Sequence, residues 1–420
     1  MTNLSPGVRR ERPAQPPTRR VSIRLFTLLA FIGAAVCSGQ LKADEIEVLN
    51  TFDTNNVAVA GKVAYAAAGP QGIVIVDLNG TEMGGPEIAG VIAPPGNTGT
   101  VDDVSIDGGL LFTLDAAGTG GLSVFSIENP LEPTLVSGPV SVGVSPFAGV
   151  SAANGRVVVS GGTGLLSVRS YQANGTLANS ASTIDLGVGQ PDVLVAENGE
   201  TAFVSTDFSG FFDGQTFGIT VIDIAPGLSI LDRIGIAGAG FSPGVDGPAN
   251  FPIESAQAGD TLYVASGNGV AVLDVSNPNS VQTQALIPLN TNPVNIDVVG
   301  DTLYVVGNSP TPTMTTIDVS VLSSPVIQTT ALPSGSRPLG VAATNTRVVI
   351  ADSNLGILVE SLLLPGDVNQ DCDVNFFDIA PFIEILITMR FQAEADVDGN
   401  NTVDFFDIVP FIEILSDSST

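Results

Sequence analysis

Short apolar segments alternate with turns over most of this chain. Between residues 45 and 364 one unit recurs: an apolar strand, a turn with Gly or Asn, a second strand, a Gly and a third apolar strand. Clear examples are "VAVAGKVAYAAAGPQGIVIVD", which starts at Val57, and "ESAQAGDTLYVASGNGVAVLDV", which starts at Glu254. Because the apolar residues do not recur at helical spacing, the pattern predicts an all-β region.

Seven copies of this unit can be aligned on the second strand. The aligned positions are spaced by 47, 47, 44, 60, 41 and 45 residues, and they are Tyr65, Phe112, Val159, Phe203, Tyr263, Tyr304 and Val349. A period in the forties, rich in Gly and β-branched residues, is typical of propeller blades. Third strands such as "GIVIVD" are apolar on both faces, which suits a sheet packed between two neighbouring sheets. The sequence therefore predicts a seven-bladed β-propeller over residues 44–364.

Several third strands carry a family resemblance. The phrases "IVIVD", "ITVIDI", "AVLDVSNP" and "TIDVS" resemble the LVIVD-repeat family of predicted β-propellers, over residues 45–364. The resemblance implies the same fold, while the number of blades follows from the repetition alone.

The two ends of the repeat region predict how the ring closes. The seventh unit supplies three strands, whereas "EIEVLNTF" (45–52) precedes the first unit without a partner. We expect this N-terminal strand to form the outer strand of the seventh blade.

Polar residues gather immediately before the first strand of each unit. These seven positions are Asn56, Asp103, Gly149, Asp192, Glu254, Asn295 and Gly340. If strands alternate in direction, all seven lie on one face of the ring. Two long insertions, 207–218 and 240–252, are predicted to open on that same face beside blades four and five. Rigid scaffolds usually bind through such loops.

This face is the predicted ligand-binding site of the propeller, with either a cation on the channel axis or a ligand beneath the two insertions. The candidate binding residues are Asp103, Asp192, Glu254, Asp207, Asp213 and Phe212. The alternative is that the Phe residues pack within their own loops and the polar residues cap turns. For the aspartates that end third strands, a turn-capping role is the prediction; they are Asp77, Asp223, Asp274 and Asp318.

A different pattern occupies the C-terminal end. "DVNQDCDVNFFD" (367–378) recurs 29 residues later as "DVDGNNTVDFFD" (396–407), and each copy runs into a nearly identical apolar segment. Calcium prefers six to eight oxygen ligands, and a twelve-residue loop supplies them from positions 1, 3, 5, 7, 9 and 12. The predicted ligands are Asp367, Asn369, Asp371, Asp373, Asn375, Asp378, Asp396, Asp398, Asn400, Thr402, Asp404 and Asp407.

The duplicated loop and helix resemble the type I dockerin domain. The resemblance covers roughly 366–415 and implies a small all-α domain of paired F-hand loops, here 365–420, that holds two Ca²⁺ ions and docks onto a cohesin. An acidic solvated tail is the alternative, but such tails do not repeat spacing and apolar helices together.

Three features of this C-terminal repeat depart from the family pattern. Cys372 stands at position 6, where Gly is usual. Positions 10 and 11 carry Phe376, Phe377, Phe405 and Phe406, and we expect at least one Phe of each pair in the core. Pro381 and Pro410 predict that each helix starts at or after the Asp of position 12, or kinks.

The first 43 residues differ in composition from the rest. They hold seven of the fourteen basic residues, followed by the apolar run "LFTLLAFIGAAV" and a small residue at Ala43. This order is typical of a secretory signal peptide, and the run is too short for a comfortable membrane span. We expect a secreted, extracellular or cell-surface protein exported from a bacterium, with Sec and twin-arginine export both open.

Composition excludes several function classes. Residues 44–420 hold 7 basic and 42 acidic residues, a net charge of −35, which disfavours nucleic acid and anionic lipid as partners. The chain has no His, which excludes His-dependent triads and His-ligated zinc. Carboxylate-pair catalysis remains available.

The preferred hypothesis is a calcium-binding recognition or assembly protein rather than an enzyme. In it, the propeller presents a binding surface and the dockerin-like module tethers it to a cohesin-like or other protein partner. One alternative is an O-glycosyl hydrolase of extracellular polysaccharide catabolism, with a polysaccharide as ligand. A structural cell-surface protein is the other.

Overall fold

The structure is a computed structural model, and it describes most of residues 46–417. The described ranges are 46–49, 52–79, 86–95, 99–115, 121–144, 147–161, 164–187, 192–212, 215–225, 227–236, 254–267, 269–362, 366–369, 374–388, 392–397 and 402–417. The predicted signal peptide, 1–43, lies outside them.

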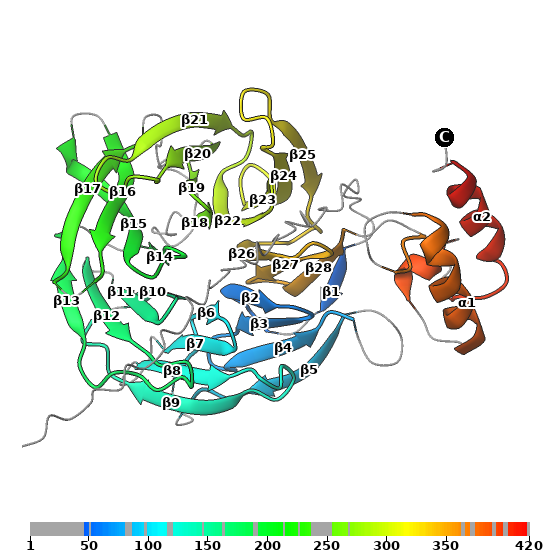
Figure 1. The fold of residues 1–420 in the computed structure, drawn as a ribbon, viewed down its shortest axis with the longest axis horizontal. Coiled ribbons are helices and arrows are strands. Elements are labelled where there is room, and N and C mark those ends of the chain that lie inside the picture. The colour runs from blue at the N-terminus through cyan, green and yellow to red at the C-terminus, as the bar shows by residue number, and fades with distance from the viewer. Residues whose placement is uncertain are drawn as a thin grey trace, which may run out of the picture. The chain divides into compact units, whose positions relative to one another are not determined.

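Seven four-stranded antiparallel sheets surround a central axis, as the repeat predicts (Figure 1). Blade one contains β2 (Asn56–Ala60), β3 (Val63–Ala67), β4 (Ile73–Asp77) and β5 (Glu87–Ile92), and blade two contains β6 (Asp103–Asp107), β7 (Leu110–Asp115), β8 (Gly121–Ser126) and β9 (Thr134–Val140). Blade three contains β10 (Phe147–Ala153), β11 (Arg156–Gly161), β12 (Leu165–Ser170) and β13 (Ser182–Asp185), and blade four contains β14 (Asp192–Val195), β15 (Thr201–Phe212), β16 (Gln215–Asp223) and β17 (Ser229–Gly235).

The remaining three blades follow the same order from the inner strand outward. Blade five contains β18 (Ser255–Ala258), β19 (Thr261–Ser266), β20 (Gly269–Asp274) and β21 (Gln282–Pro288), and blade six contains β22 (Pro293–Val299), β23 (Thr302–Gly307), β24 (Thr313–Asp318) and β25 (Val326–Ala331). Blade seven contains β26 (Pro338–Ala343), β27 (Arg347–Asp352) and β28 (Gly356–Ser361), with β1 (Glu47–Leu49) on its outer edge.

The predicted ring closure is confirmed. Strand β1 pairs antiparallel with β28, with Val48 opposite Leu358. This N-terminal strand thereby completes the last blade and joins the two ends of the repeat region through backbone hydrogen bonds.

The core lies between neighbouring blades. The aromatic side chains that align the repeats are buried at equivalent positions: Tyr65, Phe112, Phe203 and Tyr304 are each at most 2% exposed. Each inter-blade cluster draws residues from two adjacent sheets, as where Val57 and Val74 of blade one pack with Val349 and Ile357 of blade seven. A middle strand therefore packs on both of its faces, which explains its continuous apolar run.

The turn-capping prediction for the third strands is also confirmed. The carboxylates of Asp77, Asp223, Asp274 and Asp318 each accept a hydrogen bond from the backbone N–H two residues later, at 2.8–3.0 Å. These aspartates stabilise the turns that follow the third strands.

One part of the loop prediction was wrong. The segment 207–218 is not an irregular loop, because β15 and β16 continue to pair through it, with Asp207 opposite Phe217 and Phe212 opposite Gln215. The insertion lengthens the β15–β16 hairpin of blade four, with a shift in register between Asp207 and Phe212. The second insertion, 240–252, lies outside the described residues.

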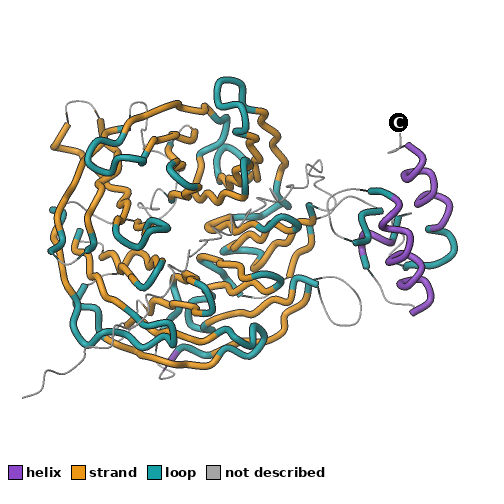
Figure 2. The backbone as a smooth tube through the Cα atoms, in the orientation of Figure 1, coloured by secondary structure: helices purple, strands orange, loops and turns teal. Residues whose placement is uncertain are grey.

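The C-terminal repeats contain two helices of ten residues (Figure 2). The 3₁₀ turn η3 (Phe376–Asp378) leads into α1 (Ile379–Thr388), and η4 (Ala393–Ala395) precedes α2 (Ile408–Asp417). Each helix begins directly after the Asp of loop position 12, as predicted. Pro381 and Pro410 are the third residues of their helices, where the missing N–H has no intrahelical acceptor to lose.

Among the described residues, no helix has both the length and the apolar character that a membrane crossing would need.

Candidate functional site

Neighbouring polar residues that precede the inner strands contact one another around the axis of the propeller. The amide of Asn56 donates to the carboxylate of Asp103, and the backbone N–H of Val150 donates to Asp103 Oδ2 at 2.6 Å. On the other side of the ring, Asn295 Oδ1 accepts from the N–H of Val341 at 3.3 Å. Side chains of one blade thus bind the start of the next blade's inner strand.

The two glycines of this ring allow close approach by their neighbours. A Cβ placed on Gly149 would lie 3.1 Å from Asp192 Oδ1 and 3.4 Å from Asp103 Oδ2. A Cβ on Gly340 would lie 2.7 Å from Asn56 Oδ1. Gly149 therefore brings two carboxylates from different blades toward the same point.

The three acids of the ring are held in an environment that favours their neutral forms. Burial raises the pKa of Asp103 to about 7, although the N–H of Val150 and the Asn56 amide favour its carboxylate. Burial also raises the pKa of Asp192 to about 6, opposed by its hydrogen bond with Glu254. The pKa of Glu254 is raised well above its ordinary value by burial and by the nearby charges of Asp192 and Asp103. No basic residue occupies any of the seven ring positions.

The other predicted binding residues of this face are only partly among the described residues. Asp207 and Phe212 lie on the backbone of the extended β15–β16 hairpin, but their side chains lie outside the described residues, as does all of Asp213. The structure therefore brings together Asp103, Asp192 and Glu254 of that prediction.

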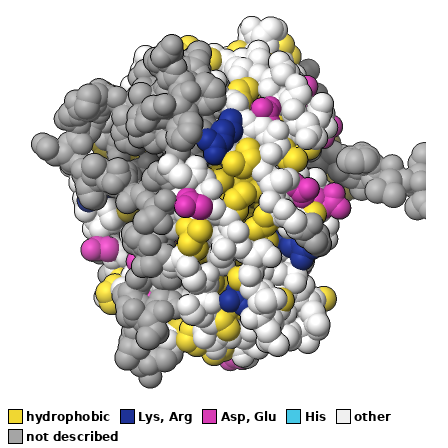
Figure 3. Space-filling model, turned by 90° about the vertical axis from the view of Figure 1, so that its left-hand side faces the viewer, with side chains coloured by type: hydrophobic (Ala, Val, Ile, Leu, Met, Phe, Trp, Pro, Cys, Tyr) yellow, Lys and Arg dark blue, Asp and Glu magenta, His cyan; other side chains and the backbone are white. Residues whose placement is uncertain are grey.

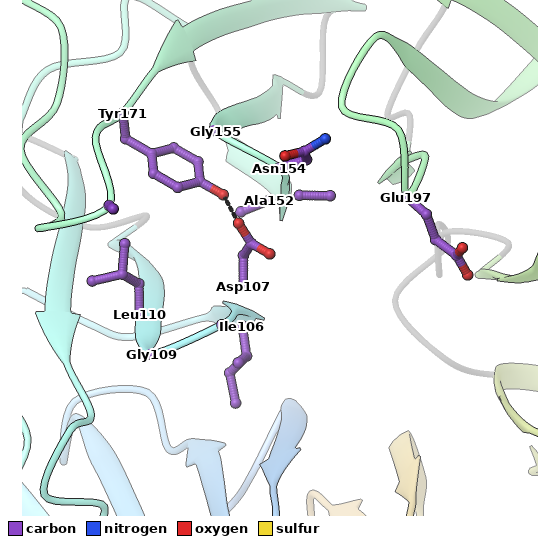
Figure 4. Close-up of a pocket in the computed structure, with 12 residues that line it drawn as sticks. Ile106, Asp107, Gly109, Leu110, Ala152, Asn154, Gly155, Tyr171 and Glu197 are labelled. Atoms are coloured by element: carbon purple, nitrogen blue, oxygen red, sulfur yellow. Dashed lines mark hydrogen bonds between the residues drawn. The ribbon is translucent and has the colours of Figure 1, made fainter. Parts of the chain in front are cut away.

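A cavity of about 710 Å³ opens on the opposite face of the ring (Figure 4). It is lined by the turn between β6 and β7 (Asp107–Leu110), the turn between β10 and β11 (Ala152–Gly155), Tyr171 and Glu197. The Tyr171 hydroxyl donates to Asp107 Oδ2, and the Tyr171 ring lies 4.7 Å from the Phe112 ring between centroids. Sequence reasoning missed this cavity, because "DG" at 107–108 and "NG" at 154–155 indicate only turns.

In the first C-terminal loop, Asp378 organises the backbone. Its Oδ1 accepts from the N–H of Asn369 at 2.9 Å, and its Oδ2 accepts from the N–H of Asn375 at 2.8 Å. Position 12 thereby binds positions 3 and 9, which closes the loop on itself. In the second loop the N–H of Asp404 donates to Asp407 Oδ2 at 2.8 Å.

Burial sets these loop carboxylates apart from ordinary surface acids. Asp367, Asp378 and Asp407 are 0% exposed. Of the other predicted ligands, Asn369, Asn375, Asp396, Thr402 and Asp404 are described, whereas Asp371, Asp373, Asp398 and Asn400 lie outside the described residues, as does Cys372. Within the described part of the chain, no three acidic or cysteine side chains are grouped so that they could hold a metal ion.

The expectation that one Phe of each pair packs in the core was wrong. Phe376, Phe377, Phe405 and Phe406 are 75%, 77%, 83% and 75% exposed. Because each helix begins only after position 12, the pairs lie in the turn before it, and the core between the helices is formed by Phe382 and Phe411 instead.

Charged side chains do not form a continuous patch on the propeller side that Figure 3 shows. Outside the grey regions, acidic and basic side chains are spread among hydrophobic and other residues. The acidic excess of the chain is thus not gathered on that side.

Comparison with known proteins supports the propeller and its repeat. Residues 53–79 and 257–283 match the LVIVD repeat family model, so LVIVD repeats occur in blades one and five. No curated protein matches the chain.

Solved structures with a similar fold belong to proteins of different kinds. A functionally unknown protein from Desulfotomaculum acetoxidans is 14% identical, with a TM-score of 0.52, covering 76% of this chain and 94% of its own. Virginiamycin B lyase from Staphylococcus aureus is 12% identical, with a TM-score of 0.54 and coverages of 76% and 99%. A chain of the mitotic checkpoint complex is 10% identical, with a TM-score of 0.54 and coverages of 77% and 96%. At such identities the likeness establishes the seven-bladed fold alone.

Proposed function

We propose that this chain is a secreted, calcium-dependent recognition and assembly protein. The propeller presents the binding surface, as propellers with LVIVD repeats suggest. The C-terminal repeats form a dockerin-like module that holds two Ca²⁺ ions and attaches the propeller to a protein partner. The signal-like composition of residues 1–43 supports export.

The burial of Asp367, Asp378 and Asp407 carries the calcium proposal. A bound cation would stabilise carboxylates that are buried in two oxygen-rich loops, and twelve-residue calcium loops supply their ligands in this way. Hydrogen bonds from the loop backbone to Asp378 fix the carboxylate at position 12, the position that completes calcium coordination in loops of this length.

The exposed Phe pairs support the docking role. Phe376, Phe377, Phe405 and Phe406 occur at equivalent positions of the two repeats, and the helices add exposed Ile387, Val409 and Ile412. Clustered apolar side chains on a soluble protein usually mark an interaction surface. A cohesin-like partner with a complementary apolar surface is the occupant that the resemblance implies.

Equilibrium dialysis of the full chain against Ca²⁺ tests the proposal. The double variant Asp378→Asn, Asp407→Asn is expected to lose two bound Ca²⁺ ions per chain and the helical signal of the C-terminal repeats. The matched control, Glu384→Gln with Glu413→Gln, removes the same charge from the helices and should bind as the parent does. Equal binding by parent and the Asp378, Asp407 variant would refute calcium loops here.

No observation on the described residues favours the polysaccharide hydrolase or the structural protein. The best carboxylate pair is Asp192 with Glu254, whose carboxyl groups hydrogen-bond each other. They lie closer together than the about 5–5.5 Å that separates the carboxylates of retaining glycosidases. This pair leaves no room for a glycosidic bond between its members.

A further inference from the structure

The interface between blades four and five contains a group of oxygen-bearing side chains. Asp192 and Ser205 lie directly opposite each other on β14 and β15, so their side chains point to the same face of the sheet. Phe203, two residues before Ser205, packs in the core between blades four and five. Asp192 and Ser205 therefore both point from blade four toward blade five.

Blade five directs two further polar groups to the same place. Ala256 packs in the core between blades five and six, so the preceding residue, Ser255, points the other way, toward blade four. The carboxyl group of Glu254 reaches Asp192 and hydrogen-bonds it. Two carboxyl groups and two hydroxyls thus converge at one end of the interface between these blades.

Both hydroxyls are buried without a hydrogen-bond partner among the described residues. Ser205 is 5% exposed and Ser255 is 7% exposed, and neither Oγ forms a hydrogen bond with a described residue. A buried hydroxyl without a hydrogen bond destabilises the folded state, because it loses its hydrogen bonds to water. The other blades mostly avoid this cost, since the residues that correspond to Ser255 are all Val or Ile: Val57, Val104, Val150, Val193, Ile296 and Val341.

Neighbouring groups add negative potential and no positive charge. Gly149 allows Asp103 Oδ2 and Asp192 Oδ1 to approach one point, as its Cβ distances show. The charge of Asp103 also acts on Glu254. No Lys or Arg stands at any ring position, so a cation would have to come from solution.

We propose that this interface binds one hard cation, best fitted by Ca²⁺, through Asp192, Glu254, Ser205 and Ser255. Two carboxylates and two hydroxyls offer up to about six oxygens, which is the lower limit of calcium coordination. The site contains only two acidic ligands, which agrees with the lack of any three-acid metal group among the described residues. It goes beyond the proposed function, because it lies in the propeller and is independent of the C-terminal loops.

The test counts Ca²⁺ bound to the full chain by equilibrium dialysis. The double variant Ser205→Ala, Ser255→Ala is expected to lose one Ca²⁺ per chain, or to bind it at least about tenfold more weakly. Without Ca²⁺ its propeller should melt at the same or a higher temperature, because two unsatisfied hydroxyls are gone. Glu254→Gln should lose the same ion, and it tests the site independently if the double variant folds poorly.

Ser167→Ala is the matched control. Ser167, on β12, is also a buried hydroxyl without a partner, but it does not occupy this interface. Its replacement should leave the Ca²⁺ count unchanged. The Asp378→Asn, Asp407→Asn variant should keep the propeller ion, so failure of the C-terminal proposal is distinguishable from failure of this one. If the serine and Glu254 variants both bind as many Ca²⁺ ions as the parent, the hydroxyls contact water only and the proposal is wrong.

Discussion

Phe382 of α1 and Phe411 of α2 stack with ring centroids 4.0 Å apart and planes 9° from parallel. They are 29 residues apart, the same interval that separates the two loops, so each repeat contributes the same side chain to one contact. Both rings are 3% exposed. The duplicated sequence therefore packs as a symmetric pair whose centre is this stack, with each oxygen-rich loop directly before its helix.

Replacing Phe411 by Ala should destabilise the helical pair by about 3–5 kcal/mol, because a large buried ring is lost and the cavity only partly collapses. Thermal unfolding followed by far-UV circular dichroism in Ca²⁺ measures the change. Phe405→Ala removes the same ring from an 83% exposed position and should change stability by no more than about 0.5 kcal/mol. Equal melting of the two variants would contradict the assignment of Phe411 to the core.

Removing the chain up to Leu49 should destabilise the propeller. The truncation deletes the three pairings of β1 with β28 and the packing of Leu49 between blades seven and one. We expect the melting temperature of the β-sheet signal to fall by roughly 5 °C or more. A truncation that ends just before Ile46 keeps β1 and serves as the control; melting as low as in the longer truncation would argue against ring closure by β1.

The exposed Phe pairs should bind an apolar dye in the folded state. Replacing Phe376, Phe377, Phe405 and Phe406 together by Ser is expected to remove most ANS fluorescence in Ca²⁺ while keeping the helical signal, since all four side chains face solvent. The matched control replaces Val321, Val326 and Ile327, exposed side chains of blade six, by Ser. A loss of fluorescence in the control and not in the Phe variant would place the apolar surface on the propeller.

The sequence predicts the propeller well because its information is periodic. Seven aligned repeats place Tyr65 and Tyr304 at equivalent positions of the second strands and Asn56 and Asp103 on one face of the ring, and local turn chemistry identifies the role of Asp274. The same reasoning predicts the closure, since the seventh unit has only three strands and one strand precedes the first unit. All of these features depend on spacing along the chain.

Features that depend on contacts between distant residues could not be predicted in this way. Ser205 and Ser255 lie on adjacent blades, 50 residues apart in sequence, and neither hydroxyl has a hydrogen-bond partner among the described residues. Tyr171 reaches Asp107 from the next blade and completes a cavity that no local motif marks. Phe376 and Phe405 are apolar, so pattern alone assigns them to a core, but their turn position before the helix leaves them in solvent.

The propeller should lose stability as pH rises through the range where Asp297 ionises. Asp297 lies on β22 and accepts hydrogen bonds from the N–H of Ala343 at 2.7 Å and of Val298 at 2.8 Å. Burial nevertheless raises its pKa from 3.8 to about 6. A folded-state pKa above the unfolded value means that the protonated form is favoured by folding, so this stability is fully present below about pH 4 and is lost as pH rises through about 6.

The raised pKa of Asp297 corresponds to at most about 3 kcal/mol in the free energy of unfolding. Chemical denaturation of the β-sheet signal at pH 4 and pH 7 measures it, and Asp297→Asn should reduce the difference between the two pH values. Asp103 has its pKa raised in the same direction, so some of the dependence should persist in the variant. Asp318→Asn is the control, because Asp318 is a turn-capping acid whose pKa is lowered by its hydrogen bonds with Ser320. Its replacement should leave the loss of stability between pH 4 and pH 7 as large as in the parent. If the Asp297 variant also loses as much stability between these pH values as the parent does, the Asp297 carboxyl group is not the one that titrates.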